Sequence, residues 1–310
     1  MNRIYLLVLI IAINFNASAQ QDAMYTHYMF NTLGVNPAYA GSRDALTVTA
    51  LHRSQWVGFN GAPTTQTLTL HSPIMSNNLG VGLSCVNDRV GPISMTSFYL
   101  DLAYKIHFGE GGGKLAIGLK GGGSAMSGSL AALKTETAGD NAFNNNIESQ
   151  FLPNFGFGIY YSKTRWYIGL STPRLLENNY SSNVVTGGTD LASEKRHYFL
   201  IGGVAIEMNE NLTFKPTSLV KLTNGAPVQL DLTAQFLIKN KFWLAPMWRS
   251  NAAAGMLVGF QFTDQLSAGY SFDWSFVNKT YTYNEGSHEV LLRYDFYYNH
   301  QRKIKSPRYF

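Results

Sequence analysis

The sequence predicts an all-β protein, a transmembrane antiparallel β-barrel of about 14 strands with both termini in the periplasm. Three observations predict it: strands of alternating polarity, an export signal, and connections that are short and long in turn. The stretch at residues 288–298 alternates most clearly, with Val290 and Leu292 on one face and Glu289 and Arg293 on the other. A period of two is typical of a β-strand whose faces meet different surroundings. Because the second face carries charges, we expect a wet interior and apolar side chains toward lipid.

Residues 1–19 are interpreted as a cleaved signal peptide. Arg3 supplies a positive start, residues 4–13 form an apolar run, and Ala17-Ser18-Ala19 matches a small-residue cleavage site. The apolar run is well short of the roughly 20 residues that a spanning helix needs. We therefore expect cleavage rather than an uncleaved anchor, with Gln20 at the mature N-terminus and the mature chain in the outer membrane.

Residues 20–45 are expected to form a periplasmic or plug segment ahead of the barrel. This stretch is too polar and irregular to face lipid, yet it contains Tyr25, Tyr28 and Phe30. We therefore expect it to fold into the periplasmic mouth or into the lumen. At the other end of the chain, residues 299–310 form a basic tail, for which the sequence leaves open whether it is ordered.

The barrel is expected over residues 46–298, because alternating segments of about 9–11 residues, the length of a spanning strand, recur there. The clearest alternation places Phe98, Leu100 and Leu102 on one face, opposite Tyr99 and Asp101 on the other. The expected strands are residues 46–55, 64–72, 79–88, 94–107, 114–128, 153–162, 165–173, 197–208, 211–221, 228–238, 241–250, 254–263, 266–276 and 288–298.

The connections between these strands test the interpretation independently. The even-numbered connections are short, for example Lys163-Thr164 and Asp264-Gln265, whereas Ser129–Leu152, Arg174–Arg196 and Val277–Ser287 are all odd-numbered. Outer-membrane barrels have short periplasmic turns and longer external loops. A soluble β-sandwich gives no reason for this sorting, so the lengths favour the barrel.

Composition narrows the class further. Aromatic residues make up 14% and charged residues 14% of the chain, against a typical charged share of about 25%. Those values suit a surface shared between lipid and water. The formal net charge of +5 does not indicate a nucleic-acid partner, because four of the positive charges lie in the tail at residues 299–310. Cys85 is the single cysteine, which excludes an intramolecular disulfide.

Four motifs occur in a fixed order along the mature chain. They are Asn36-Pro37-Ala38-Tyr39-Ala40-Gly41, Arg53-Ser54-Gln55-Trp56-Val57-Gly58, Gly61-Ala62-Pro63-Thr64 and Ser287-His288-Glu289-Val290-Leu291-Leu292. In this order they resemble the PorP/SprF family of type IX secretion membrane proteins, and the resemblance covers essentially the whole chain from Gln20 to the last strand.

The resemblance implies an outer-membrane barrel that works with components of the type IX secretion machinery. It also implies that the protein assists the export or surface retention, or both, of a large partner protein of the cell surface. Such partners are often adhesins used in gliding motility, and they carry a C-terminal sorting domain. The expected partners are therefore a cell-surface protein of this kind, the secretion machinery and outer-membrane lipid.

The motifs also supply the candidate partner- or plug-binding residues, which are Asn36, Pro37, Gly41, Arg53, Gln55 and Trp56. Pro37 fixes its own φ angle and pushes Asn36 toward extended geometry, and Gly41 is expected to supply a turn. Arg53 shares the expected inner face with Gln55, where it could tie down the N-terminal segment or bind a carboxylate of the partner. We favour the first interpretation, in which the motifs hold the segment and the barrel together.

No catalytic, cofactor-binding or metal-binding residues are expected, so the protein is not expected to be an enzyme. The histidines are scattered, and neither an HxxxH nor an HExxH spacing occurs. A Gly-x-Ser-x-Gly elbow is also missing from the sequence. The glycines at residues 111–113 and 121–123 lack the Lys-Ser/Thr of a phosphate-binding loop. We expect residues 121–123 to be a strand that bends or that the plug approaches closely.

The alternative function is a channel or transporter for small solutes. Charged residues of both signs fall on the expected inner faces, among them Asp101, Lys105, Asp231 and Asp273, and these could line a water channel or pair with one another. About fourteen strands enclose a wider lumen than the roughly eight strands that side chains alone can fill. Water, inserted loops or the N-terminal segment must therefore occupy the interior.

Overall fold

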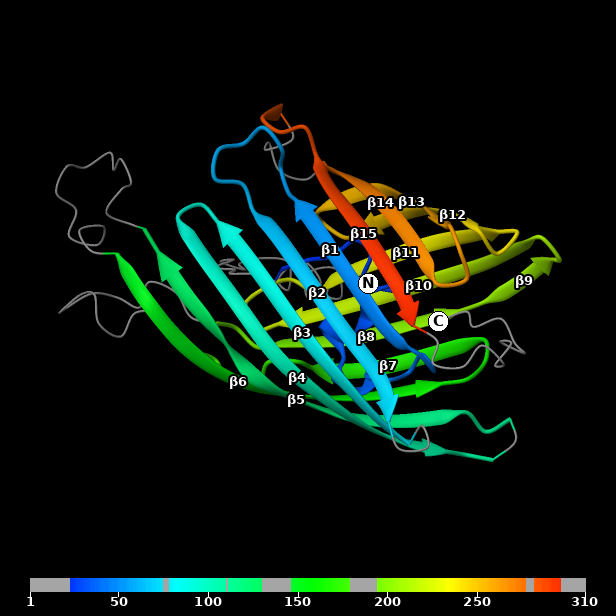
Figure 1. Ribbon diagram of the computed structural model, residues 1–310. Coiled ribbons are helices and arrows are strands. Elements are labelled where there is room, and N and C mark those ends of the chain that lie inside the picture. The colour runs from blue at the N-terminus through cyan, green and yellow to red at the C-terminus, as the bar shows by residue number, and fades with distance from the viewer. Residues whose placement is uncertain are drawn as a thin grey trace, which may run out of the picture.

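The computed structural model describes residues 23–74, 78–109, 111–129, 146–178, 194–276 and 282–296. Within them the chain forms one closed antiparallel β-barrel (Figure 1). The expected signal peptide at residues 1–19, the tail at residues 299–310 and much of the three longest expected loops lie outside the described residues.

The strands follow one another around the ring in chain order. Their bounds are β1 (Leu46–Ser54), β2 (Thr64–Ile74), β3 (Leu79–Val90), β4 (Ile93–His107), β5 (Lys114–Gly128), β6 (Ile147–Ser162), β7 (Trp166–Thr172), β8 (His197–Val204), β9 (Ile206–Asn209), β10 (Leu212–Thr223), β11 (Gln229–Ile238), β12 (Phe242–Arg249), β13 (Ala253–Gln261), β14 (Leu266–Ser275) and β15 (Ser287–Phe296).

Closure of the ring confirms the predicted antiparallel β-barrel of about 14 strands. The first strand, β1, pairs with the last strand, β15, from Leu46 opposite Phe296 to Ser54 opposite His288. Strands β8 and β9 both pair with β10 and together fill one place, so the fifteen labelled strands make a barrel of fourteen. The strand ends that are joined by the longest connections, residues 55–63, 129–146, 173–196 and 276–286, all lie at one end of the barrel, the long-connection end. The opposite end is called the short-turn end.

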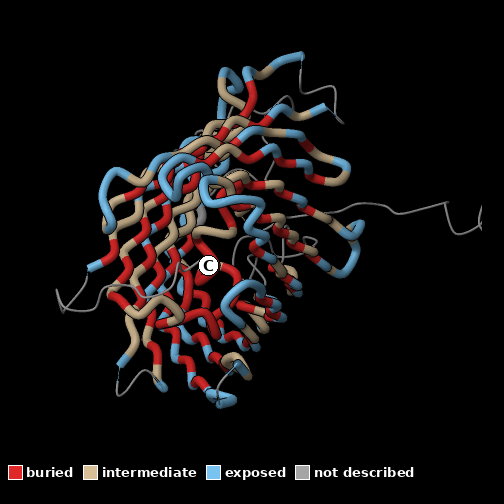
Figure 2. The backbone as a smooth tube through the Cα atoms, turned by 90° about the vertical axis from the view of Figure 1, so that its right-hand side faces the viewer, coloured by how far each residue is buried: buried red, intermediate tan, exposed pale blue. Residues whose placement is uncertain are grey.

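The predicted alternation is present along the strands. On β4, for example, Leu102 exposes 59% of its surface whereas Asp101 exposes 1%. Figure 2 shows the same alternation of buried and exposed residues around the ring. Because outward side chains are apolar and inward ones are polar over most of the wall, the outer surface is suited to lipid.

Most expected strands agree with the observed ones to within two residues at each end, but two differ more. The strand expected at residues 153–162 begins earlier, at Ile147, because the stretch before Pro153 continues the ladder with β5. Its polar residues resemble those of a loop, which is why the sequence pattern missed them. The strand expected at residues 197–208 is interrupted at Ala205, and the pairing of β9 with β10 shifts in register near Leu212.

The expectation of a wet inner face is wrong for part of the barrel. Glu289 is fully buried and Asp295 is 1% exposed. Their charges are compensated by arginines rather than by water, as Arg53 pairs with Glu289 and Arg43 pairs with Asp295. The interior is therefore packed with polar groups and with the N-terminal segment, which covers these carboxylates.

Two short helical turns, α2 (Thr32–Val35) and η1 (Pro37–Tyr39), lie in the segment before β1. Among the described residues, no helix has the length and apolar character needed to cross a membrane.

Candidate functional site

The candidate site is the interior of the barrel, where residues 23–45 run from one half of the lumen to the other (Figure 1). This stretch is called the N-terminal segment. Its beginning contacts Arg53, near the long-connection end of β1, and its later part contacts His71, near the short-turn end of β2. The segment therefore joins the two halves of the interior.

A buried ionic cluster holds the beginning of the segment. Both carboxylate oxygens of Glu289 accept hydrogen bonds from the backbone, from the N–H of Thr26 at 2.9 Å and that of His27 at 2.7 Å. Arg53 donates to Glu289 at 3.1 Å, to Asp273 at 2.7 Å and to the hydroxyl of Thr26 at 2.7 Å. Arg53 thus links two wall carboxylates to the segment, and each charge has an opposite charge beside it.

Two tyrosines on either side of Thr26 and His27 also fix the segment to the wall. The Tyr28 hydroxyl lies 3.1 Å from the hydroxyl of Thr217 and 3.3 Å from that of Thr233. The Tyr25 hydroxyl accepts a hydrogen bond from Thr67 at 3.0 Å. Burial raises the pKa of each of these two tyrosines to about 12, so both phenols remain protonated at neutral pH.

The turn that follows is capped by its own asparagine. Asn36 adopts an extended backbone, and its side-chain oxygen accepts a hydrogen bond from the N–H of Ala38 at 3.0 Å. Pro37 occupies the first position of η1, where its lack of an N–H costs nothing. The side-chain nitrogen of Asn36 donates to the carbonyl of Ile159 on β6 at 3.0 Å. One side chain therefore shapes the turn and ties it to the wall.

A row of small residues in the wall receives this turn. Gly80, Ala103, Gly118, Gly158 and Ser171 lie opposite one another across strands β3 to β7. A methyl group added at Gly80 would overlap the carbonyl of Ala40, and one added at Gly118 would overlap the backbone of Ala38. These five residues, the small-residue row, let the backbone of the segment approach the sheet closely.

The last part of the segment is fixed at the short-turn end. Gly41 has a φ of +65°, its N–H donates to His71 at 3.2 Å, and its carbonyl accepts a hydrogen bond from Lys105. Arg43 forms an ion pair with Asp295 at 2.8 Å. Glycine is required at this turn both by the left-handed φ angle and by the backbone of Gly80 beside it.

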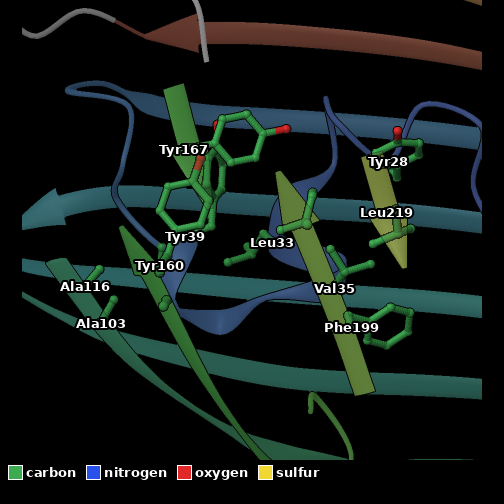
Figure 3. Packing of buried hydrophobic residues seen from close by; sticks show 13 residues of the cluster. Tyr28, Leu33, Val35, Tyr39, Ala103, Ala116, Tyr160, Tyr167, Phe199 and Leu219 are labelled. Atoms are coloured by element: carbon green, nitrogen blue, oxygen red, sulfur yellow. The ribbon is translucent and has the colours of Figure 1, made fainter. Parts of the chain in front are cut away.

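Apolar contacts complete the packing of the segment. Figure 3 shows Leu33, Val35 and Tyr39 of the segment among Tyr160, Tyr167 and other residues of the wall. The ring of Tyr39 meets that of Tyr160 edge-on at 5.5 Å between centroids. Buried aromatic pairs of this kind contribute about 0.5–1.5 kcal/mol beyond the area that they bury. Polar and apolar contacts therefore act together on the same short stretch.

The remaining part of the interior is a cavity of about 700 Å³, which we call the vestibule. Its floor includes Tyr25, Tyr28 and Val35 of the N-terminal segment. Its wall residues come from the halves of the strands next to the long-connection end, for example Met95 on β4 and Asp231 on β11. The vestibule thus reaches from the segment toward the mouth at the long-connection end.

The six candidate residues predicted from the sequence fall into two groups. Asn36, Pro37 and Gly41 lie in the turn against strands β2 to β6. Arg53, Gln55 and Trp56 line the vestibule. The structure does not bring the two groups together, although Arg53 reaches the beginning of the same segment through Thr26.

Sequence reasoning missed the small-residue row and misplaced the glycine contact. Residues 121–123 lie in a strand, β5, as expected, but the alternative that the plug approaches them closely is wrong. A methyl group at Gly121 would meet nothing within 4 Å, and Gly122 and Gly123 face neighbouring strands instead. The usable signal was a glycine at an inward position of an alternating strand, as at Gly118 and Gly158. The partners of Arg53 on β14 and β15 lie more than 200 positions away and carried no local signal.

The chain is similar to known membrane proteins in sequence and in fold. The family model described as type IX secretion system membrane protein PorP/SprF matches residues 17–294. No curated protein matches. A Pseudomonas aeruginosa FadL homologue has a similar structure, with a TM-score of 0.52 and 14% identity over 91% of this chain and 96% of that chain. The CymD monoaromatic hydrocarbon channel has a TM-score of 0.53 and 10% identity over 87% and 93% of the two chains. At such low identity these two structures show the fold alone.

Proposed function

This chain belongs to the PorP/SprF family of type IX secretion system membrane proteins, and on that basis we propose that it assists the secretion or surface anchoring of a partner cell-surface protein. The partner would carry a C-terminal sorting domain, and the protein would act together with other parts of the type IX machinery. An adhesin of gliding motility is the kind of partner that the family suggests.

The fixed N-terminal segment is the observation that best supports an anchoring role. The segment is held at its beginning by Arg53 and Glu289, in its middle by Asn36 and near its end by Arg43. A barrel that transports solutes needs a clear path, whereas a barrel that holds a protein benefits from a rigid interior. The segment is therefore proposed to act as a plug and to support the binding surface at the long-connection end.

The connection lengths support a proposal for the orientation of the barrel in the membrane. We propose that the short-turn end faces the periplasm and that the long-connection end faces outward, as in other outer-membrane barrels. Strands β1 and β15 then begin and end at the periplasmic side. The described part of the segment starts at Ala23, which lines the vestibule.

The inner charges give less support to a solute channel than the sequence suggested. Lys120 pairs with Asp101 at 2.9 Å and Arg249 pairs with Asp231 at 2.8 Å. Charges that neutralise one another within the wall contribute little to the attraction of an ion or a charged solute. We therefore propose the anchoring role ahead of transport.

Deletion of the gene tests the proposal. The surface proteome of the deletion strain is expected to lack one large protein with a C-terminal sorting domain, and the wild-type gene is expected to restore it. Growth on small nutrients is the control, and it is expected to be unchanged. An intact surface proteome together with impaired solute uptake would contradict the proposal and favour a transporter.

A further inference from the structure

We propose that the vestibule is a binding site for a polypeptide, and that a segment of the partner protein inserts into it from the long-connection end. This inference rests on the proposed function and adds the place and the chemistry of binding. The candidate residues Asn36, Pro37 and Gly41 would then hold the N-terminal segment that forms the floor of the site. The partner would contact Gln55 and Trp56 at its wall and rim, while Arg53 stays buried and holds the beginning of the segment.

The shape of the vestibule suits an inserted segment that does not pass through. Its floor is formed by Tyr25, Tyr28 and Val35, all of which are fixed to the wall or packed against it. Its volume of about 700 Å³ is that of a pocket for a small ligand, so it has room for a short stretch of a polypeptide and not for a folded domain. An inserted segment would therefore meet a rigid floor at the N-terminal segment.

The lining has the residue types that protein interfaces favour. Aromatic residues, methionine and arginine are enriched in the cores of such interfaces. The vestibule combines all three kinds, namely Tyr25, Trp56, Met95, Met126, Arg174 and Arg249. Met95 also packs against the buried pair Met126 and Leu152, which forms an apolar patch on one wall. Flexible methionines can adapt to the side chains of a peptide.

The charges of the vestibule point to the same class of ligand. Cations and anions stand side by side, as in Arg53 with Asp273 at 2.7 Å and Arg174 with Glu194 at 2.9 Å. Because these charges are paired with one another, the vestibule suits the uncharged N–H and C=O groups that a polypeptide presents along its whole length. An anionic or cationic solute would be matched better by an excess of one sign.

Filling the vestibule tests the inference. Ala253 is buried and lines the vestibule, whereas Ala254, the next residue of β13, points outward. The Ala253→Trp variant is expected to lower the surface level of the partner roughly tenfold or more, which corresponds to a loss of about 1.4 kcal/mol in binding. Ala254→Trp is the matched control and is expected to display the partner normally. The partner is the protein whose surface display is lost on gene deletion.

A crosslinking experiment tests whether the partner enters the vestibule, even where the Ala253→Trp barrel fails to assemble. A photoreactive amino acid at Met95 faces the vestibule, one at Phe98 faces outward, and one at Lys241 lies at the short-turn end. The partner is expected to crosslink from Met95 and not from Phe98 or Lys241. Crosslinking from Lys241 alone, or normal display in an assembled Ala253→Trp barrel, would overturn the inference and leave the anchoring role standing. A surface proteome that is intact after gene deletion would instead contradict the proposed function itself.

Discussion

Replacing Glu289 by alanine is expected to destabilise the folded barrel by about 3–5 kcal/mol, the usual cost of removing one partner from a buried ion pair. The carboxylate of Glu289 accepts hydrogen bonds from the backbone of Thr26 and His27 and lies beside Arg53. Without it, the charge of Arg53 keeps only Asp273 as its counter-ion, and two backbone N–H groups lose their acceptor. The expected result is a lower unfolding temperature in detergent and release of the N-terminal segment.

A second glutamate provides the matched control for this variant. Glu207 also forms an ion pair, with Arg165 at 2.8 Å, but both members of this pair are exposed. Exposed pairs contribute only about 0–1 kcal/mol, so Glu207→Ala is expected to unfold nearly as the wild type does. Equal unfolding temperatures for the Glu289 and Glu207 variants would show that the buried cluster does not hold the segment.

Replacing Gly118 by alanine is expected to displace the turn at residues 36–41 and to cost about 1–3 kcal/mol, as overpacking of a well-packed interior does. The added methyl group would overlap the backbone of Ala38. A shift of Ala38 would strain the hydrogen bond from Asn36 to the carbonyl of Ile159, which holds the turn against the wall. Limited proteolysis of the purified barrel measures the effect, because a displaced segment becomes accessible to cleavage.

The same strand supplies the control for Gly118. At Gly121 a methyl group would meet nothing within 4 Å, and this residue is exposed on the outer face. Gly121→Ala is therefore expected to resist proteolysis as the wild type does. If both variants, or neither, exposed the segment to the protease, the small-residue row would not be the surface that receives the turn.

The barrel could be predicted from the sequence because its determinants are local. Each strand has lipid on one side and the interior on the other, so the alternation at Leu100, Asp101 and Leu102 is readable without knowledge of the partner strands. The connection lengths also predicted that the longest connections join strand ends at the same end of the barrel. The start of β6 at Ile147 was missed because the pairing with β5, and not the local pattern, extends that strand.

The interior could be predicted only in part, because its contacts are long-range. The alternation of β1 predicts that Arg53 lies on the inner face, where it can tie down the N-terminal segment. Its carboxylate partners Asp273 and Glu289 are brought to it by the closure of the ring between β1 and β15. The small-residue row likewise depends on the registers of four strand pairs, which place Gly80, Gly118 and Gly158 in line. Such alignments are fixed by topology and not by the pattern of any one strand.

Hydrogen exchange of the purified full-length protein tests most directly whether residues 26–41 form a fixed element inside the barrel. The backbone N–H groups of Thr26 and His27 are bound to Glu289, and that of Gly41 is bound to His71. We predict that these amides exchange as slowly as those of the neighbouring strands, over hours rather than seconds. Exchange of the whole stretch at the rate of an unfolded peptide, with the strands still protected, would contradict the account.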